Sequence, residues 1–377
     1  MAFAAAGIGV LAPGRAAEVD LMQELARAAK EAGVELDIPT WDLSAEVDLA
    51  LGHADNVTLA PIAPDSSAFA RLALNTLAWR TVGDAVELVG FADGTFTRYF
   101  SAETDDAALV IARAEGRWRP EGAWRGSLAV QGIHQDEVID ASSLENDLGA
   151  VHARLGSAAL LATLECDLTR AWTLSLRPAG RRFDYRAPLD DFTEYEAEMV
   201  VARDFGSAGK LALAARRMER GYDNRPQAGP VGRPIYGTHL RVGQAAADLR
   251  HELTGSREQP WSARLRIGYL ENRDNGSGYY DYDRWFADLR AAVTRGAWSV
   301  EAEVGWHDTT YLVQLTGFGI APERRERTEW RGFIRIERNL GARVTLFAEW
   351  DITDSASNDL FIDYESATAL AGVRLAF

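Results

Sequence analysis

The sequence has very little cysteine and no long apolar run. Cys166 is the single cysteine in 377 residues, which excludes an intramolecular disulfide and a cysteine-based zinc site. No stretch of eighteen or more apolar residues occurs, so the mature chain has no candidate transmembrane helix. Basic residues are also outnumbered, and the net charge is -16. A nucleic-acid partner needs a basic face, so this charge argues against one.

The N-terminal part differs in composition from the rest of the chain. Residues 2–12 form an apolar run of the length found in signal peptides, and the "GRAA" that follows supplies small residues suited to cleavage. The basic residues that usually precede such a run are missing, and a flexible tail is the alternative. We predict a signal peptide over residues 1–17.

Residues 18–43 are predicted to form a periplasmic helical segment or plug. Asp20 to Ala32 is rich in helix formers and is followed by Gly33, a favourable residue just past a helix end. This is the one short helix that the sequence predicts.

From residue 44 to residue 377 the hydrophobic pattern has a period of two. "WSVEAEVGW", residues 298–306, alternates Trp, Val, Ala, Val and Trp with Ser, Glu, Glu and Gly. "WSARLRIGY", residues 261–269, alternates in the same way, with two arginines on its polar face. One apolar face and one charged face indicate strands that meet different solvents on their two sides.

Short and long connections alternate along this region and separate about sixteen segments, within a range of 14–18. A soluble β-sandwich rarely has strands longer than ten residues, and several segments here run to twelve or more. A propeller or β-helix should show a repeated motif, and none is present. We therefore predict an all-β fold, a transmembrane antiparallel up-and-down β-barrel whose apolar face meets lipid.

Tryptophan positions give an independent indication of a membrane. Four tryptophans directly follow short turns, and aromatic rings prefer the membrane–water boundary at strand ends. The predicted interface girdle is Trp124, Trp172, Trp261 and Trp298.

The segment "SATALAGVRLAF" places Ala369, Ala371, Val373, Leu375 and Phe377 on one strand face. With the features above, it resembles Gram-negative outer-membrane β-barrel proteins. The resemblance implies a bacterial outer-membrane location and an assembly signal made by Val373, Leu375 and Phe377. It also implies partners: outer-membrane lipid and lipopolysaccharide, and the barrel-assembly machinery.

A narrower likeness rests on "LGHADNVTLAP" and "SASNDLFIDYESATALAGVRLAF". These segments are similar to porin-type barrels and to the barrel domain of surface lipoprotein assembly modifiers. Those modifiers carry an array of helical repeats before the barrel, whereas only one helix is predicted here. We predict a porin-like channel that conducts or exports a polar solute through a charged lumen. The alternative is a translocation and assembly barrel for a surface-exposed protein partner.

Alternation also predicts which charged residues face a wet lumen, where they could set selectivity. The alternative is that these charges pair across neighbouring strands. Residues 158–168 and 244–253 break the pattern and yield no assignment. The predicted pore-lining residues are Arg71, Arg113, Arg125, Arg177, Arg264, Arg266, Arg284, Asp288, Arg290, Glu301, Glu303, Arg331, Arg335, Glu349, Asp351 and Arg374.

No catalytic motif surrounds any of the six histidines, so we predict a non-enzyme, with a barrel hydrolase as a third possibility because distant residues can meet in space. We predict no metal site and no cofactor, because the acidic loops match no calcium-binding motif. "APERRERTEW", residues 321–330, is predicted to be a basic loop whose Arg324, Arg325 and Arg327 pair with acidic loops or with lipopolysaccharide phosphates.

Overall fold

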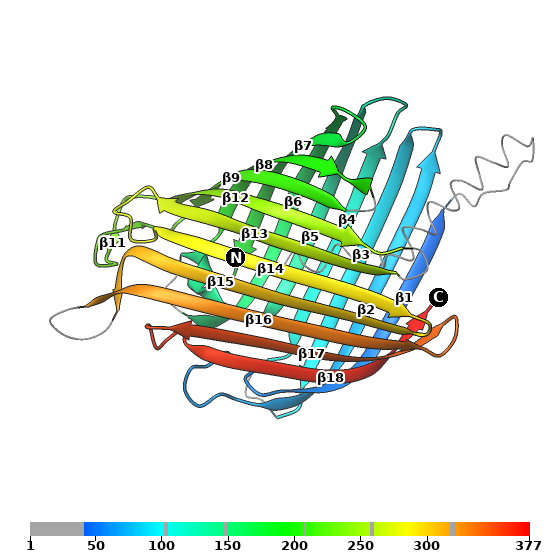
Figure 1. The fold of residues 1–377 in the computed structure, drawn as a ribbon. Helices are drawn as coiled ribbons and strands as arrows, with labels where there is room; N and C mark the ends of the chain where they lie inside the picture. The colour runs from blue at the N-terminus through cyan, green and yellow to red at the C-terminus, as the bar shows by residue number, and fades with distance from the viewer. Residues whose placement is uncertain (1–40, 102–104, 146–148, 207–208, 257–259, 317–321) are drawn as a thin grey trace, which may run out of the picture.

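The computed structural model describes residues 41–101, 105–145, 149–206, 209–256, 260–316 and 322–377. Sixteen strands form one closed barrel in which neighbours in the ring are antiparallel, as Figure 1 shows. The predicted all-β barrel and its strand number are therefore confirmed. The helix expected at Asp20 to Ala32 lies outside the described residues.

The barrel strands follow one another around the ring in chain order. They are β1 (Asp42–Ala54), β2 (Ser67–Val82), β3 (Val86–Tyr99), β4 (Ala107–Trp118), β5 (Trp124–Asp140), β6 (Ala150–Asp167), β7 (Trp172–Tyr185), β8 (Phe192–Asp204), β9 (Lys210–Tyr222), β12 (Arg241–Thr254), β13 (Trp261–Asp274), β14 (Tyr282–Arg295), β15 (Trp298–Thr316), β16 (Glu323–Asn339), β17 (Val344–Ser357) and β18 (Tyr364–Ala376). A small hairpin of β10 (Gln227–Ala228) and β11 (Pro234–Ile235) lies between β9 and β12. The short 3-10 helix η2 (Ala141–Leu144) follows β5.

The ring closes where the first strand pairs with the last. Glu46 to Ala54 on β1 pairs with Thr368 to Ala376 on β18. The Phe377 amide continues this ladder by donating to the Ala45 carbonyl at 2.9 Å. A closed ring leaves no strand edge without hydrogen-bond partners.

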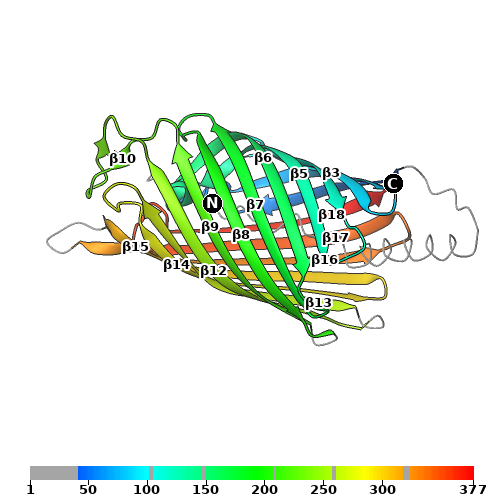
Figure 2. The same cartoon turned by 90° about the horizontal axis from the view of Figure 1, so that it is seen from above.

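The connections differ in length at the two ends of the barrel. The end that contains Phe377 has the shorter turns and is called the short-turn end; the opposite end is called the long-loop end. Figure 2 shows the long-loop end with the β10–β11 hairpin and the projecting orange tips of β15 and β16. β15 is the longest strand, with 19 residues, and its ladder with β16 is irregular between Thr310 and Leu315.

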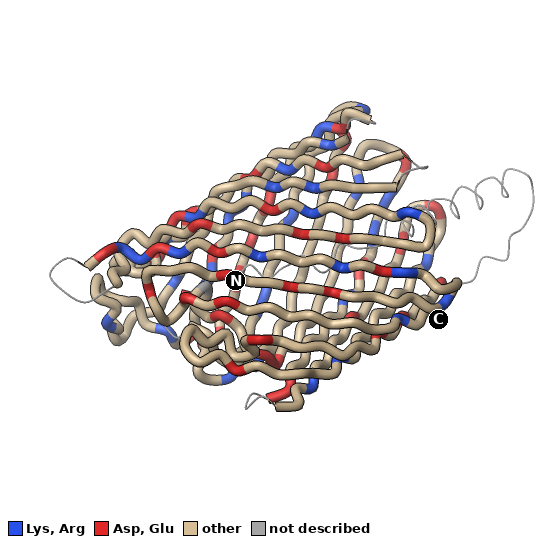
Figure 3. Tube along the Cα trace, turned by 60° about the horizontal axis from the view of Figure 1, so that its bottom comes forward, with Lys and Arg blue, Asp and Glu red and all other residues tan. Residues whose placement is uncertain are grey.

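Exposed apolar side chains cover the outer face of the barrel. On β13, Leu265 and Ile267 are 38% and 45% exposed, while Arg264 and Arg266 alternate with them on the other face. Figure 3 shows the resulting scatter of charged positions along the strands. Among the described residues, no helix is both long and apolar enough to cross a membrane.

The two segments without a sequence assignment are ordinary barrel strands. In β12, Asp248 and Arg250 are buried or half-buried and alternate with the exposed Leu249. Alanines lie on both faces of this strand, so its sequence does not alternate between apolar and polar residues. The regular backbone pairing between β6 and β7 is interrupted opposite Pro178, because proline has no amide hydrogen to donate.

Candidate functional site

The charged residues that the sequence assigned to a pore all lie on the face of the wall opposite the exposed apolar residues. They come from β2, β4, β5, β7 and β13–β18 and therefore surround the interior on most sides. Most of them form ion pairs with other inner-wall residues. Their role in lining a conducting path stays a prediction.

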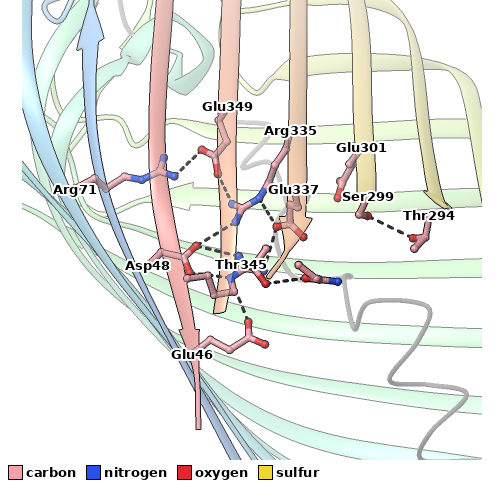
Figure 4. Close-up of polar contacts among 12 residues, drawn as sticks. Glu46, Asp48, Arg71, Thr294, Ser299, Glu301, Arg335, Glu337, Thr345 and Glu349 are labelled. Carbon is pink, nitrogen blue, oxygen red and sulfur yellow. Dashed lines mark hydrogen bonds and ion pairs between the residues drawn. The ribbon is translucent and has the colours of Figure 1, made fainter. Parts of the chain in front are cut away.

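One group of these residues links the strands on both sides of the closure, as Figure 4 shows. Arg335 on β16 lies 2.7 Å from Glu337 and 3.2 Å from Asp48 on β1. Arg374 on β18 lies 2.8 Å from the same Asp48 and 3.2 Å from Glu337. The two guanidinium groups thus share two carboxylates and link three strands near the ring closure.

A further contact extends this group to β2. Arg335 also pairs with Glu349 on β17, and the other carboxylate oxygen of Glu349 lies 2.6 Å from Arg71. The Arg71 side chain reaches past β1 and β18 to make this contact. The whole group, which we call the closure network, holds five adjacent strands together through inner-wall charges.

A second chain of ion pairs runs along the wall from β7 to β13. Arg177 lies 3.4 Å from Glu198, which also pairs with Arg250. Arg250 contacts Asp248 at 2.5 Å, and Asp248 lies 3.1 Å from Arg266. Basic and acidic groups alternate along this chain, so their charges largely cancel within the wall.

Two carboxylates on the wall from β15 to β17 differ from the rest. Glu301 pairs with Arg290 on β14. Within the described part of the chain, Glu303 and Asp351 form no ion pair within 4.0 Å. Glu303 is half-buried and Asp351 is exposed, so both carboxylates face the interior without an ion-pair partner among the described residues.

Large aromatic rings on the inner wall lie over glycines of the neighbouring strand. At Gly372, an added Cβ would approach the Phe347 ring within 2.8 Å. The Arg335 guanidinium lies 4.2 Å from the same ring centroid, so the phenyl group is covered on two sides. Glycine thus makes room for the ring to lie against the wall. The directly opposed pairs are Gly52–Phe69, Gly268–Phe286 and Gly372–Phe347.

The segment after β5 crosses the barrel interior. Asp140, the last residue of β5, lies 2.6 Å from Arg327 on β16, and Ser142 in η2 accepts from the same guanidinium at 2.7 Å. Six strands separate β5 from β16 on one side of the ring and eight on the other. A contact between two such strands spans the interior. We call residues 140–145 the crossing segment.

The end of the crossing segment is anchored on another part of the wall. The Glu145 carboxylate accepts from Arg220 on β9 at 2.7 Å and from the Tyr222 hydroxyl at 2.6 Å. Glu194 on β8 also accepts from Arg220, at 3.0 Å. Arg220 and Glu145 are each 3% exposed, so the pair is fully shielded from solvent.

An apolar cluster fills the space between the crossing segment and the wall. Ala141 is fully buried and Leu144 is 2% exposed, although both belong to a connection between strands. Their apolar neighbours come from strands β6–β9 and β12 and from neighbouring loops. The cluster contains Ala141, Leu144, Ala153, Leu155, Phe183, Tyr185, Leu189, Phe192, Tyr222, Ala228, Leu240, Val242 and Tyr280.

Sequence reasoning did not identify the residues that anchor the crossing segment. Residues 142–149, "SSLENDLG", have the composition of an acidic loop, and the alternation gives no role to Arg220. The available signal is the inward position of Phe183, Phe192 and Tyr222, which are large apolar side chains on the polar face of their strands. Such residues need an apolar partner inside the barrel.

The prediction of a basic loop at residues 321–330 is wrong. Residues from Glu323 onward belong to β16, and Arg325 and Arg327 are buried inner-wall residues. Arg325 lies 3.3 Å from Asp359 of the last long loop and donates to Gln314 at 2.7 Å. These two side chains are therefore engaged by acidic and polar partners inside the barrel. Arg324 alone remains exposed.

The girdle tryptophans each lie at the first residue of a strand at the short-turn end. Their exposed fractions are 51% for Trp124, 39% for Trp172, 42% for Trp261 and 49% for Trp298. Phe377, which is 72% exposed, lies at the same end of the barrel. The girdle and the assembly-signal roles remain predictions, which this placement at one rim favours.

Histidines do not gather at one place among the described residues. His152 lies 2.5 Å from Asp136 near the long-loop end, and His307 lies 3.7 Å from Asp288 on the inner wall. Within the described ranges, no group of three or more His, Cys, Asp or Glu side chains could hold a metal ion.

Comparisons with known proteins give fold likeness only. No protein-family model matches the chain. No curated protein matches it either. Among solved structures, OccK3 (OpdO) of Pseudomonas aeruginosa is 14% identical, with a TM-score of 0.43, over 90% of this chain and 96% of that chain. An anion-selective porin from Comamonas acidovorans is 8% identical, with a TM-score of 0.44, over 89% and 99%. A bacterial polysaccharide outer membrane secretin is 10% identical, with a TM-score of 0.42, over 88% and 97%.

The barrel itself identifies the environment of the protein. Its strands close without an edge, its outer face is apolar, and its inner face is charged. Closed barrels are the form in which strands span lipid, because every backbone group must find a partner within the protein. The chain is therefore a closed sixteen-strand antiparallel β-barrel with the apolar outer face and charged inner face of a barrel that spans a membrane.

Proposed function

We propose that the protein is a channel for small polar solutes and that it has no enzymatic activity. The observation that carries this proposal is the charged inner wall, which comes from strands all around the ring. Barrels of about sixteen strands are wide enough to enclose an aqueous path. Charged side chains that line such a path act on the solutes that pass.

The crossing segment would set the narrowest point of this path. It lies between Arg327 on β16 and Arg220 on β9 and holds an apolar cluster against one side of the interior. Solutes would then pass on the other side, along the wall that carries the closure network. Because both anchors are buried arginines, the segment would stay in place during conduction.

Single-channel recording of the purified protein in a planar bilayer tests this function. We expect a steady open conductance that rises when the anchor is released by Arg220→Met, because the crossing segment then leaves the path. Ser262→Arg, on the inner wall of β13 away from this anchor, is the matched control and should not widen the channel.

If the barrel instead translocates a surface protein, single-channel recording should give a different result. Such a barrel would be closed alone and would become active only with its partner. A wild-type protein that inserts correctly but never conducts would contradict the channel proposal and favour this alternative.

A further inference from the structure

The inner wall of strands β2–β5 includes a group of apolar side chains, although this face borders the lumen (Figure 1). On β2 they lie an even number of residues beyond Arg71, which the closure network places on the inner face. Alternation therefore points them inward as well. The group, which we call the inner apolar patch, consists of Leu77, Trp79, Val89, Phe91, Ile111 and Ile133.

The inner apolar patch is continuous across four strands. On β2 and β3, Leu77 is directly opposite Phe91, and the next inward pair is formed by the tryptophan and the valine. On β4 and β5 the two isoleucines are opposite each other. Ile111 is diagonal to Phe91, whose direct partner on β4 is Arg113. Since neighbouring strands lie about 4.8 Å apart, the patch is roughly 14 Å wide.

Within the described ranges, none of the six side chains belongs to a buried apolar cluster. All six are half-buried. The wall from β7 to β9 differs, because its inward Phe183, Phe192 and Tyr222 are packed in one cluster with Leu144 of the crossing segment. Apolar surface left in water costs free energy in proportion to its area. The inner apolar patch therefore needs a covering partner, as the other wall does.

The chain that precedes the first strand has a pattern that fits this patch. In the helix predicted over Asp20 to Ala32, Leu21 and Leu25 are four residues apart and share one face. Closer to β1, residues 34–38 alternate Val, Leu and Ile with Glu and Asp. Both parts of residues 18–40 thus combine an apolar side with an acidic one.

The described chain also begins beside the patch. Asp42, the first residue of β1, is directly opposite Trp79 in the ladder with β2. An extended chain spans at most about 3.5 Å per residue, so residues 34–40 could reach roughly 24 Å. This reach exceeds the width of the patch.

The charges around the patch complement those of residues 18–40. Arg113 and Arg117 share a single carboxylate, that of Glu115, at 2.9 and 3.1 Å. One positive charge is therefore not balanced within this trio. The Nε atom of Arg113 is buried and has no hydrogen-bond partner in the described chain. Residues 18–40 contain six acidic residues and two basic ones, so they can supply the missing acceptors.

We propose that residues 18–40 lie inside the barrel and cover the inner apolar patch. The apolar side chains of the segment would pack on Trp79 and Phe91, and its acidic residues would face Arg113 and Arg117. The segment would then narrow the lumen from the side opposite the cluster that the crossing segment holds. The effect on conductance rests on the proposed channel function, whereas the contact itself does not.

Disulfide formation in the full-length chain tests the contact. Cys166→Ser removes the natural thiol, and Leu25→Cys is then combined with Leu77→Cys on the patch. After oxidation and denaturation, PEG-maleimide should add no mass to most chains, because the two thiols have paired. The matched control combines Leu25→Cys with Ser262→Cys on the inner face of β13, which six strands separate from β2 on one side and eight on the other. Control chains should take up two PEG groups.

A second experiment releases the segment without shortening the chain. Leu21→Asp with Leu25→Asp should make a lone thiol at Leu77→Cys react faster with a water-soluble maleimide, and the single-channel conductance should rise. Gln23→Asp with Ala26→Asp adds the same charge to the opposite face of the predicted helix and should change neither quantity. Heat-modifiable migration on gels verifies that each variant forms the barrel.

Two results would overturn the proposal. The first is an equal disulfide yield from the two walls, or no disulfide with either, because the segment would then have no preference for the patch. The second is a thiol at Leu77→Cys whose reaction rate is unchanged by the two aspartates, since residues 18–40 would then not cover it. A wild-type barrel that never conducts, in a protein whose cysteine pair forms the disulfide, would contradict the channel function and still support this contact.

Discussion

The two faces of the same barrel wall differ in what determines their residues. On the outer face of β13, Leu265 and Ile267 need only be apolar, because fluid lipid surrounds them whatever their neighbours are. On the inner face, Arg266 must find Asp248 on the adjacent strand. The outer face is therefore specified one residue at a time, whereas the inner face is specified by pairs of residues that are far apart in the sequence.

The buried anchor of the crossing segment should show the largest effect of breaking such a pair. Arg220→Met leaves Glu145 and Glu194 buried without their shared cation. Removing one partner of a buried ion pair costs about 3–5 kcal/mol. We expect the free energy of unfolding, measured in lipid vesicles with urea, to fall by that amount.

A compensated variant sharpens this result. Replacing Arg220 by Met and both Glu145 and Glu194 by Leu removes all three charges together. Apolar replacement of a whole buried network is often neutral. We expect most of the lost stability to return, and a triple variant as unstable as the single one would argue against buried charge as the cause.

A charge on the outer face should have the next largest effect. Leu265→Arg places a guanidinium toward lipid, which costs roughly 2–4 kcal/mol at the bilayer midplane and less near its edges. Ser262→Arg, three residues earlier on the inner face, places the same group toward the barrel interior, opposite Thr254 and Ala292. The free energy of unfolding in lipid should fall clearly more for Leu265→Arg than for Ser262→Arg. Equal losses of stability in the two variants would contradict the assignment of the two faces.

A smaller effect is expected from filling a glycine on the inner face. Gly372→Ala adds a Cβ that would approach the Cβ of Ala50 and the Phe347 ring, each within 2.8 Å. Overpacking costs about 1–3 kcal/mol. Gly221→Ala on β9 is the matched control, because nothing lies within 4 Å of its added Cβ. We expect the free energy of unfolding to fall for the first variant only.

The contrast between the faces explains which features the sequence could predict. The strand number, the closed barrel and the outward residues follow from a hydrophobic pattern with a period of two. Each outward residue can be recognised by its own apolar character. Inward charges follow from the same alternation, so the positions of Glu301 and Arg374 could be predicted. Their partners could not, because pairing depends on register between strands and on side chains that reach past a neighbour, as Arg71 does.

The crossing segment shows a second limit. Its sequence is short and acidic, like other loops, and its anchors lie on β9 and β16, 75 and 185 residues away along the chain. Only the barrel brings these residues together. Arg327 was interpreted as part of a basic loop because RRERTE contains no apolar residue, and apolar alternation cannot mark a strand that extends beyond the lipid.

The smallest expected effect concerns ion preference, with the fold left intact. Glu303 and Asp351 lie on neighbouring parts of the inner wall and form no ion pair within the described chain, so they contribute net negative charge to the proposed path. Their field is incompletely screened within about 8–10 Å at ordinary ionic strength. Glu303→Gln with Asp351→Asn should therefore shift the reversal potential under a salt gradient toward anions. Removing Arg290 and Glu301 together deletes one charge of each sign and should leave the reversal potential unchanged. An unaltered potential in a conducting Glu303 and Asp351 double variant would show that these carboxylates do not line the path.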